Sequence, residues 1–402
     1  MKTQAAAATL ALSGLSLVTA LGAGLEANWQ AVRAGRSALA PCRFDTLPIA
    51  AYAGEMAGLD EALTYPWAEF DCRNNRLAEL ALRQDGFLQA VEQARAAYGA
   101  ARIAVFTGTS TSGILNTEQA YRQRDPDTGA LPPGFDYGRT HNTHALGRFV
   151  RTRLGLGGPS FTLSTACAAG AKLFATASRM LAAGLCDAAV IGAADSFCAT
   201  TLFGFHALGV MAEGPCRPFD AARNGISIGE AAGFALLERA PARPQAGTIL
   251  LLGSGESSDA YHMSSPDPEG GGAGMAMRRA LDEAGLRPAG IDYINLHGTA
   301  TLAGDAAEDK AVTALFGPEM PRSSSKGFTG HTLGAAGMVG AAMAALSIRH
   351  GFLPGSPHTA TLDAAFAPGH VLQGRPGKVE RVMCNAFGFG GVNCSFILGR
   401  PA

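Results

Sequence analysis

Short apolar runs alternate with alanine-rich segments along most of this 402-residue chain. Continuous apolar runs of this kind are typical of strands buried on both faces, and the alanine-rich segments have the length of helices. The pattern therefore predicts an α/β protein whose sheets are covered by helices on both sides. Expected strands are 102–108, 188–193, 232–239, 248–256, 293–298 and 392–399, and expected helices are 164–184, 271–285, 305–316 and 334–350.

A chain of this length can bury a large core and is long enough for two domains. The stretch "APARPQAG" at 240–247 places Pro, Ala and Gly between two strand-like runs, which marks a boundary. We expect a first half at 1–245 and a second half at 246–402. Both halves alternate strand and helix without repeating each other's sequence. The segment 122–139, rich in Asp, Pro and Gly, is expected to be a surface insertion.

The charge and the cysteines exclude several classes of function. A formal net charge of −1 gives no overall attraction to nucleic acid or to an anionic membrane. The eight cysteines form no CxxC motif and no Cys/His cluster, so neither a disulfide framework nor a zinc site is indicated. We expect no metal, no nucleic-acid partner and a reducing, cytoplasmic location. No apolar run approaches the ~20 residues of a membrane span.

The N-terminal stretch "MKTQAAAATLALSGLSLVTALGA" allows two interpretations. It resembles a secretory signal, with a lysine, an apolar run and small residues near its end. Alternatively it is a buried first strand that ends in a glycine-rich turn, followed by a helix at about 25–36. The run has only one basic residue and is interrupted by polar ones, which favours the strand; these residues are Lys2, Thr3, Gln4, Thr9 and Ser13.

Cys167 lies in "FTLSTACAAGAKL", where a strand-like run passes directly into a helical pattern. A thiol at the start of a helix faces unpaired backbone N–H groups and the positive end of the helix dipole. We therefore expect a lowered thiol pKa and a reactive thiolate, with small neighbours that leave room for a substrate. The alternative is a packed core cysteine, the usual state of a free cysteine. This stretch alone does not decide between them.

Two histidines and a lysine supply the partners that a nucleophilic cysteine needs. His297 follows the strand-like run "YINL", and His331 opens a Gly/Ala-rich helix five residues after Lys326. Imidazoles in such places can stay neutral and donate hydrogen bonds to a developing oxyanion. The turn "NAFGFGGVN" at 385–393 can add backbone N–H groups to an oxyanion hole. A lone loop histidine or glycine turn is weak evidence, but together these features favour catalysis.

Four motifs resemble those of the β-ketoacyl-acyl carrier protein synthases, the elongating condensing enzymes. They are "STACAAG", "HGTAT" followed by "GD", "GHTLGAAG" with its histidine five residues after Lys326, and "NAFGFGG". Weaker matches, among them "LVTALG" and "CRPFDAARNGISIGEAAG", extend the resemblance over essentially the whole chain. Within the family, "GESSDAYHMSSP" and "YINLHGTAT" look closest to the ketosynthases of aryl polyene clusters. The resemblance implies a duplicated thiolase-type fold with five layers, α/β/α/β/α.

The resemblance also implies a role for each matching residue. Cys167 accepts the acyl chain, His297 and His331 stabilise the enolate formed from a malonyl-carrier thioester, and Lys326 acts electrostatically. Phe389 gates the acyl channel, and its N–H forms the oxyanion hole with that of Cys167. Thr299, Thr301 and Ser264 match positions that bind the pantetheine arm. No cofactor is bound permanently, since phosphopantetheine arrives on the acyl carrier protein, and the enzyme is expected to be a dimer.

Three positions depart from the family pattern. Gly340 stands where a glutamate usually supports the lysine, so Lys326 either has another partner, such as Glu308 or water, or lies in a looser site. His206 replaces an arginine that binds the carrier's phosphate in housekeeping enzymes. Thr111, in "GTSTSG", replaces an aliphatic residue that gates the acyl pocket. A more polar or flatter pocket would suit a stiff conjugated chain.

Several alternatives stay open at this point. Housekeeping fatty acid elongation competes with polyene assembly as the pathway, and the dimer partner is either an identical chain or a ketosynthase-like paralogue. A non-catalytic subunit of the chain-length-factor type lacks the nucleophile, whereas Cys167, His297 and His331 are all present here. Thiolases and initiating synthases, which use coenzyme A thioesters, employ different partners for their cysteine. A pure scaffold or carrier-binding module would not need this set of residues.

Overall fold

One mixed β-sheet runs through the molecule, in the order β12-β11-β15-β16-β10-β1-β9-β7-β5-β6, with β2 paired to β1. The computed structural model describes residues 9–44 and 49–401. The strands that come from the first half are β1 (Leu10–Thr19), β2 (Gly22–Ala23), β5 (Ile103–Gly108), β6 (Ser160–Leu163), β7 (Ala188–Asp195) and β9 (Ala231–Arg239). Those from the second are β10 (Leu250–Ser258), β11 (Tyr293–Asn295), β12 (Arg322–Ser323), β15 (Arg381–Gly388) and β16 (Val392–Gly399).

The two halves of this sheet repeat the same strand order. Reading outward from the junction of β1 and β10, the first half runs β1-β9-β7-β5-β6 and the second runs β10-β16-β15-β11-β12. In each half the first three strands pair antiparallel and the last two add in parallel. The duplication that the family resemblance implies is therefore visible in the backbone, although the two sequences do not repeat.

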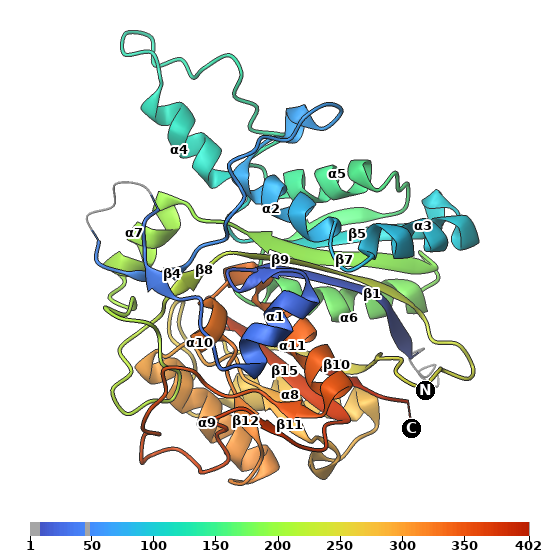
Figure 1. Cartoon of the computed structure of the whole chain (residues 1–402), viewed down its shortest axis with the longest axis vertical. Helices are drawn as coiled ribbons and strands as arrows, with labels where there is room; N and C mark the ends of the chain where they lie inside the picture. The colour runs from blue at the N-terminus through green and yellow to red at the C-terminus, as the bar shows by residue number, and fades with distance from the viewer. Residues whose placement is uncertain (1–8, 45–48, 402) are drawn as a thin grey trace.

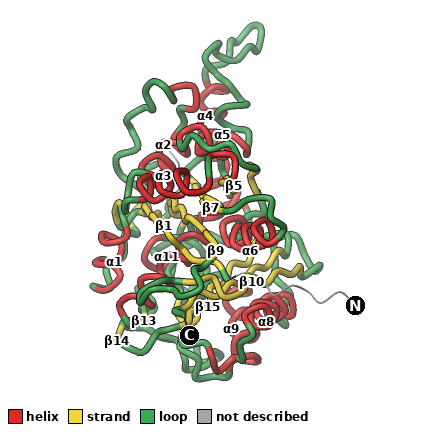
Figure 2. Tube along the Cα trace, turned by 90° about the vertical axis from the view of Figure 1, so that its right-hand side faces the viewer, coloured by secondary structure: helices red, strands yellow, loops and turns green. Residues whose placement is uncertain are grey.

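Helices form the remaining layers (Figures 1 and 2). The central layer consists of α6 (Ala169–Ala182) and α11 (Ala336–His350), which contact each other and the strands of both halves. One outer layer covers the first half with α2 (Arg73–Leu82), α3 (Phe87–Tyr98) and α5 (His144–Arg153). The opposite layer covers the second half with α8 (Gly271–Ala284) and α9 (Leu302–Phe316). This is the predicted α/β/α/β/α arrangement.

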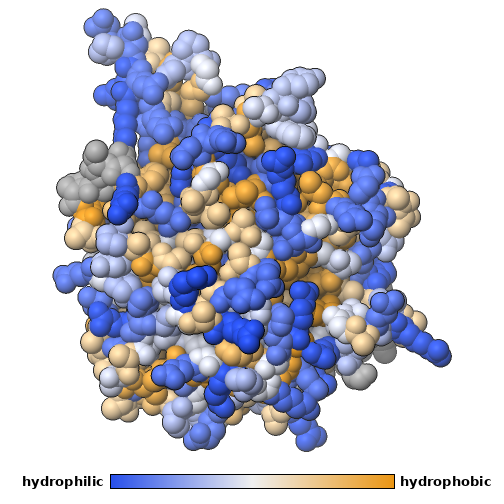
Figure 3. All heavy atoms as spheres, viewed as in Figure 1, coloured by the Kyte–Doolittle hydropathy of each residue, from blue (hydrophilic) through white to orange (hydrophobic). Residues whose placement is uncertain are grey.

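Shorter elements complete the chain. α1 (Leu25–Arg33) packs against β1 and α11. The others lie in the connections: α4 (Ile114–Arg122), α7 (Ala199–Ala207), α10 (Lys326–Thr329), β3 (Ala40–Pro41), β4 (Tyr52–Gly54), β8 (Ile228–Gly229), β13 (Phe352–Leu353) and β14 (Arg375–Pro376). The predicted insertion 122–139 extends from the end of α4 as a projecting, largely hydrophilic arm, and most of its residues are exposed (Figures 1 and 3).

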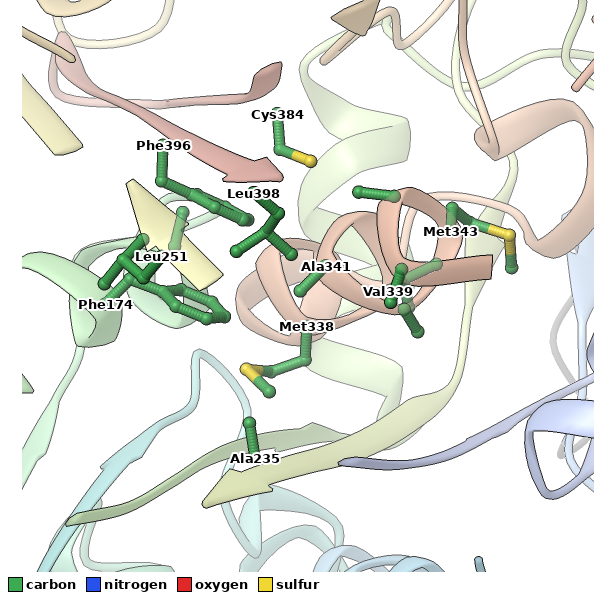
Figure 4. Close-up of a cluster of buried hydrophobic side chains, with 14 of the residues drawn as sticks. Phe174, Ala235, Leu251, Met338, Val339, Ala341, Met343, Cys384, Phe396 and Leu398 are labelled. Atoms are coloured by element: carbon green, nitrogen blue, oxygen red, sulfur yellow. The ribbon is translucent and has the colours of Figure 1, made fainter. Parts of the chain in front are cut away.

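The core is centred on α11, which is buried from Gly337 through Ile348. Figure 4 shows Met338, Val339 and Ala341 on this helix, with Ala235 of β9 on one side and Phe396 and Leu398 of β16 on the other. A helix buried all round has no amphipathic stripe to display. Seven of its fifteen residues are alanine or glycine, and such small side chains let the two halves of the sheet approach the helix closely.

The predicted strands and helices are present, with shifted ends. The expected first strand is confirmed over Leu10–Thr19, while residues 1–8 lie outside the described part of the chain. The helix expected from 164 starts only at Ala169, and the one expected to reach 36 ends at Arg33. The division at 245/246 stays a prediction, since β1 and β10 pair across it within one sheet. Within residues 9–44 and 49–401, no helix has the length and apolar character to cross a membrane.

Candidate active site

Cys167 lies on a tight turn between β6 and α6. The residue before it, Ala166, has a left-handed backbone with φ 48°, a conformation that costs energy for any residue with a β-carbon and is tolerated best by small ones. On the other side, Ala168 is the N-cap of α6. The turn presents the thiol, which is 6% exposed, to an internal cavity. The sequence predicted this strand-to-helix placement.

His331 occupies the matching position ahead of the other central helix, α11. The two helices meet closely at their N-terminal turns because glycines stand at the contact. A β-carbon on Gly337 would lie 2.1 Å from the backbone nitrogen of Ala171, and one on Gly170 would lie 2.6 Å from the carbonyl oxygen of Gly334. This close approach brings Nε2 of His331 to 2.9 Å from Sγ of Cys167.

His297 follows β11 and is held through its backbone. Carboxylate oxygens of Glu308, on α9, accept hydrogen bonds from the N–H groups of His297 (2.8 Å) and Gly298 (2.7 Å). The Lys326 ammonium group donates to the carbonyl oxygen of His297. The His297 ring lies edge-on to that of His331, with 5.3 Å between ring centroids. Both imidazoles therefore face the same small space beside Cys167.

Burial controls protonation at these residues. It lowers the pKa of His297 and of His331 well below the ordinary value, and the nearby charge of Lys326 lowers both further. The rings are therefore neutral at physiological pH, as predicted. In each ring Nδ1 is buried without a hydrogen-bond partner among the described residues. A buried unpaired N–H is less favourable than an unpaired lone pair, which places the ring proton on Nε2.

The prediction of a lowered thiol pKa is wrong. Burial raises the pKa of Cys167 to about 12, although the charge of Lys326 and the N–H groups of Cys167 and Phe389 act in the opposite direction. Loss of solvation for a sulfur anion in this enclosed position outweighs the effects of Lys326 and of the two N–H groups. The resting residue is therefore a thiol, and the surrounding donors stabilise a thiolate only when it forms.

Lys326 is buried behind His297, and its charge interacts with that of Glu308. Burial lowers the pKa of Lys326, while Glu308 raises it. A β-carbon on Gly340 would face the amide nitrogen of Asn295 at 3.0 Å and then the side chain of Cys384. Of the two alternatives raised by the missing glutamate, the structure supports another partner for Lys326: its ammonium group donates to the carbonyl oxygen of His297, and Glu308 acts on it through charge.

Phe389 lies in the turn between β15 and β16, over the cysteine. Its backbone N–H and that of Cys167 itself both act to lower the pKa of the Cys167 thiol, against the larger effect of burial. Gly390 and Gly391, with φ 85° and 74°, give the turn a backbone that other residues rarely adopt. The Phe389 ring stacks on that of Phe205 from α7, with centroids 5.7 Å apart.

These residues surround a cavity of about 310 Å³. Its lining includes most of the predicted site residues: Cys167, His297, His331, Phe389, Thr299, Thr301 and Ser264. Thr111 does not line this cavity; it is buried, and its hydroxyl donates to Asp195 at 2.8 Å. His206 is exposed on α7 and does not line the cavity either, whereas its neighbour Phe205 does.

Two protein-family models match the sequence of this chain. The model of the β-ketoacyl synthase N-terminal domain matches residues 8–242, and that of the β-ketoacyl synthase C-terminal domain matches residues 249–360. The chain belongs to the β-ketoacyl synthase family. As a member of this family it is an acyl-transferring condensing enzyme of the thiolase-type fold, as the sequence motifs predicted.

Relatives of this β-ketoacyl synthase align over almost their full length. It is 33% identical to 3-oxoacyl-[acyl-carrier-protein] synthase 2 of Coxiella burnetii and 34% identical to that of Rhizobium meliloti, over 97% of this chain and 98% of each relative. Among solved structures, the ketosynthase ApeO in complex with its chain length factor ApeC from Xenorhabdus doucetiae is 37% identical, with a TM-score of 0.88 and 100% of both chains covered. The ishigamide ketosynthase/chain length factor structure is 28% identical, with a TM-score of 0.87.

Some functional positions of the β-ketoacyl synthase were not evident from sequence. Glu308 was considered only as a partner for Lys326, while its direct hold on the His297 backbone follows from the folded helix α9. Asn385 donates to Glu308 at 3.1 Å and adds to the same support. Phe205 carries no motif signal, since a single aromatic residue in a helix usually packs in a core. Its contact with Phe389 appears only in three dimensions.

Proposed function

We propose that this β-ketoacyl synthase uses Cys167 to carry an acyl group and condenses it with a malonyl-carrier thioester, with loss of carbon dioxide. The observation that carries the proposal is the 2.9 Å contact between Cys167 Sγ and His331 Nε2, in a cavity that His297 also lines. The N–H groups of Cys167 and Phe389 complete the constellation. Nucleophile and anion-stabilising donors are thus brought to one point from both halves of the chain.

The first step is a thioester exchange. The Cys167 sulfur attacks the acyl carbon, the C–S bond to the carrier breaks, and the thiol proton ends on the departing carrier sulfur. One thioester replaces another of similar energy, so the step needs little driving force. His331 Nε2–H stabilises the sulfur anion as it forms, and the N–H groups of Cys167 and Phe389 bind the tetrahedral oxyanion.

In the second step the bond between the malonyl methylene and its carboxylate breaks, and carbon dioxide leaves. The electron pair moves to the thioester oxygen as an enolate, which the neutral donors His297 and His331 stabilise. The methylene carbon then attacks the acyl carbon on Cys167. The C–S bond to Cys167 breaks, and the sulfur takes up one proton, which restores the resting thiol. Lys326 and Glu308 act as positioning residues for His297.

The substrates arrive on an acyl carrier protein, and the enzyme itself holds no permanent cofactor. Thr299 and Thr301, whose hydroxyls lie 3.0 Å apart, and Ser264 line the cavity where a pantetheine arm would run to Cys167. Six arginines are candidates for contact with the acidic carrier: Arg73, Arg76, Arg122, Arg124, Arg151 and Arg153. Arg73 forms an ion pair with Glu230, Arg76 with Asp71 and Arg153 with Glu79, which makes these arginines less available to a carrier.

We propose polyene assembly of the aryl polyene type as the pathway, with fatty acid elongation as the alternative. Support comes from the 37% identity to ApeO over the whole chain and from the sequence resemblance described above. The same comparison supports a chain-length-factor-like paralogue as partner, and an identical chain is the alternative. Strand β6 ends the sheet, and one of its edges pairs with no strand of residues 9–44 and 49–401, which suits pairing with a second subunit. The cytoplasm remains the proposed location.

Mass spectrometry after incubation with acyl-loaded carrier protein tests the proposal. The wild type should gain one acyl group on the peptide that contains Cys167, and Cys167→Ala should gain none. Cys42→Ala, which changes a half-buried cysteine elsewhere, serves as the control and should behave like the wild type. Failure of the wild type to take up any acyl group, alone or with a paralogue present, would favour a non-catalytic subunit. A panel of saturated and conjugated chains then separates the two pathways.

A further inference from the structure

We propose that Phe205 is a specificity-determining residue, which holds the Phe389 ring in its resting place and so decides which acyl chains reach Cys167. The inference rests on the proposed function, because it concerns the acyl chain that Cys167 accepts. Phe205 does not belong to any of the motifs that identify the family in this sequence. It enters the argument through its position in the folded chain.

The two rings form one side of the cavity beside the cysteine. Their centroids are 5.7 Å apart and their planes differ by 29°, which is a stacked arrangement. Both residues line the cavity together with Cys167. The family resemblance makes Phe389 the residue that gates the acyl channel, so its ring leaves Phe205 when a chain passes, and the contact between the two rings is lost.

The two partners differ in their freedom to move. Phe389 stands in a turn between glycines, and Gly390 and Gly391 both have positive φ values. Phe205 stands on α7, whose first turn is held by Glu118 from α4. The Glu118 carboxylate accepts hydrogen bonds from the N–H of Ala199 (3.0 Å) and from the N–H and hydroxyl of Thr200 (2.6 Å each). Phe205 is therefore the fixed side of the contact, and Phe389 is the side that moves.

This contact links chain entry to chemistry. In the stacked position, Phe389 also directs its backbone N–H at the sulfur of Cys167. Displacing the ring exposes one face of Phe205 to the incoming chain. A flat conjugated chain can stack on that face and replace the lost contact, whereas a saturated chain of equal length has no π-face to offer. Stacked pairs of this kind change equilibria by about two- to tenfold, so Phe205 should favour conjugated chains by that factor.

The test measures how fast Cys167 is acylated by two carrier-bound chains of equal length, one conjugated and one saturated. Phe205→Ala and Phe205→Leu should lower the rate ratio in favour of the conjugated chain by about two- to tenfold. Phe205→Tyr keeps the ring and should keep the ratio. Phe203→Ala is the matched control, since Phe203 lies on the same helix, is 43% exposed and does not line the cavity.

Each outcome decides the matter. A ratio that is unchanged in Phe205→Ala and Phe205→Leu overturns the inference, even though the acyl-enzyme still forms. The same fall in Phe203→Ala also overturns it, because disturbance of α7 in general would then explain the effect. If the wild type accepts no chain, the proposed function fails first. Thermal unfolding of each variant shows whether a lost rate reflects lost folding, and the ratio within one variant does not depend on the folded fraction.

Discussion

Glu308 and Lys326 hold the same residue, His297, by opposite polar groups of its backbone. The Glu308 carboxylate accepts from the N–H of His297 and the Lys326 ammonium donates to its carbonyl oxygen. Both side chains are buried, and burial raises the pKa of Glu308 and lowers that of Lys326; the charge of each opposes the shift that burial causes in the other. The His297 imidazole is thus positioned by two oppositely charged side chains that bind its backbone.

Neutralising one member of this pair should weaken both folding and chemistry. Glu308→Gln removes the charge that keeps Lys326 ionised and leaves a buried ammonium without compensation. We expect a loss of about 3–5 kcal/mol in the free energy of unfolding and a large fall in condensation rate. Denaturant titration and product formation measure the two effects. Glu92→Gln, which alters an exposed ion pair on α3, should change neither, and an unaltered Glu308→Gln enzyme would refute the positioning role.

Substitution of His331 and of His297 should affect the rates of the two chemical steps differently. Of the two histidines it is His331 that contacts the sulfur, so His331→Asn is expected to slow both acyl transfer and malonyl decarboxylation. His297→Asn should slow decarboxylation by about 10²–10³-fold, the usual cost of one lost oxyanion donor, while acyl transfer stays near its normal rate. Single-turnover acylation and release of labelled carbon dioxide measure the steps independently. Equal losses in both steps for His297→Asn would contradict this division.

The raised pKa of Cys167 predicts a steep pH dependence of its alkylation. With the pKa raised to about 12, the thiolate fraction increases roughly tenfold per pH unit through the whole range below that value. Iodoacetamide labelling of the Cys167 peptide, followed by mass spectrometry between pH 7 and pH 10, should therefore rise without a plateau. Cys167→Ala gives the background from the other cysteines. A plateau already below about pH 8 would show that the helix N-terminus and Lys326 outweigh burial.

The glycine contact between the central helices should be essential to the site. Gly337→Ala places a methyl group 2.1 Å from the backbone nitrogen of Ala171, so the helices must separate. Overpacking of this kind costs about 1–3 kcal/mol or more, and any separation lengthens the distance from His331 to Cys167. We expect reduced stability and a loss of acyl transfer. Gly134→Ala, where a β-carbon meets open space in the projecting arm, provides the comparison and should leave both unchanged.

Sequence patterns predicted those strands and helices whose burial produces a continuous apolar run. The strands at 188–193 and 392–399 are continuous apolar runs, and the buried helix α11 is recognisable by its alanine and glycine content. The outer helices α2, α3 and α5 of the first half were not predicted, whereas α8 and α9 of the opposite outer layer were. Helix ends shifted by a few residues because capping at Ala168 and Ala335 involves no side-chain hydrogen bond that a sequence could display.

At the site, the residues that line the cavity were predictable from sequence, whereas the pKa of the Cys167 thiol and the contacts between distant segments were not. The motifs placed Cys167, His297 and His331 in one cavity, and the structure brings them together there. The thiol pKa was predicted in the wrong direction, because desolvation depends on everything packed around the sulfur rather than on its own turn. The partner of Lys326 and the contact of Phe205 with Phe389 depend on segments far apart in the chain. A lone glutamate or phenylalanine gives no sign of such contacts.

Cys167 and His331 reach the cavity from opposite halves of a backbone whose strand order repeats. Each stands ahead of a central helix, and the two helices occupy matching positions in the repeated strand order. The backbone around the cavity is therefore similar on its two sides, whereas the side chains that it presents are different, a thiol on one side and an imidazole on the other. The asymmetry that separates an attacking group from a donor thus lies in the side chains and not in the backbone that carries them.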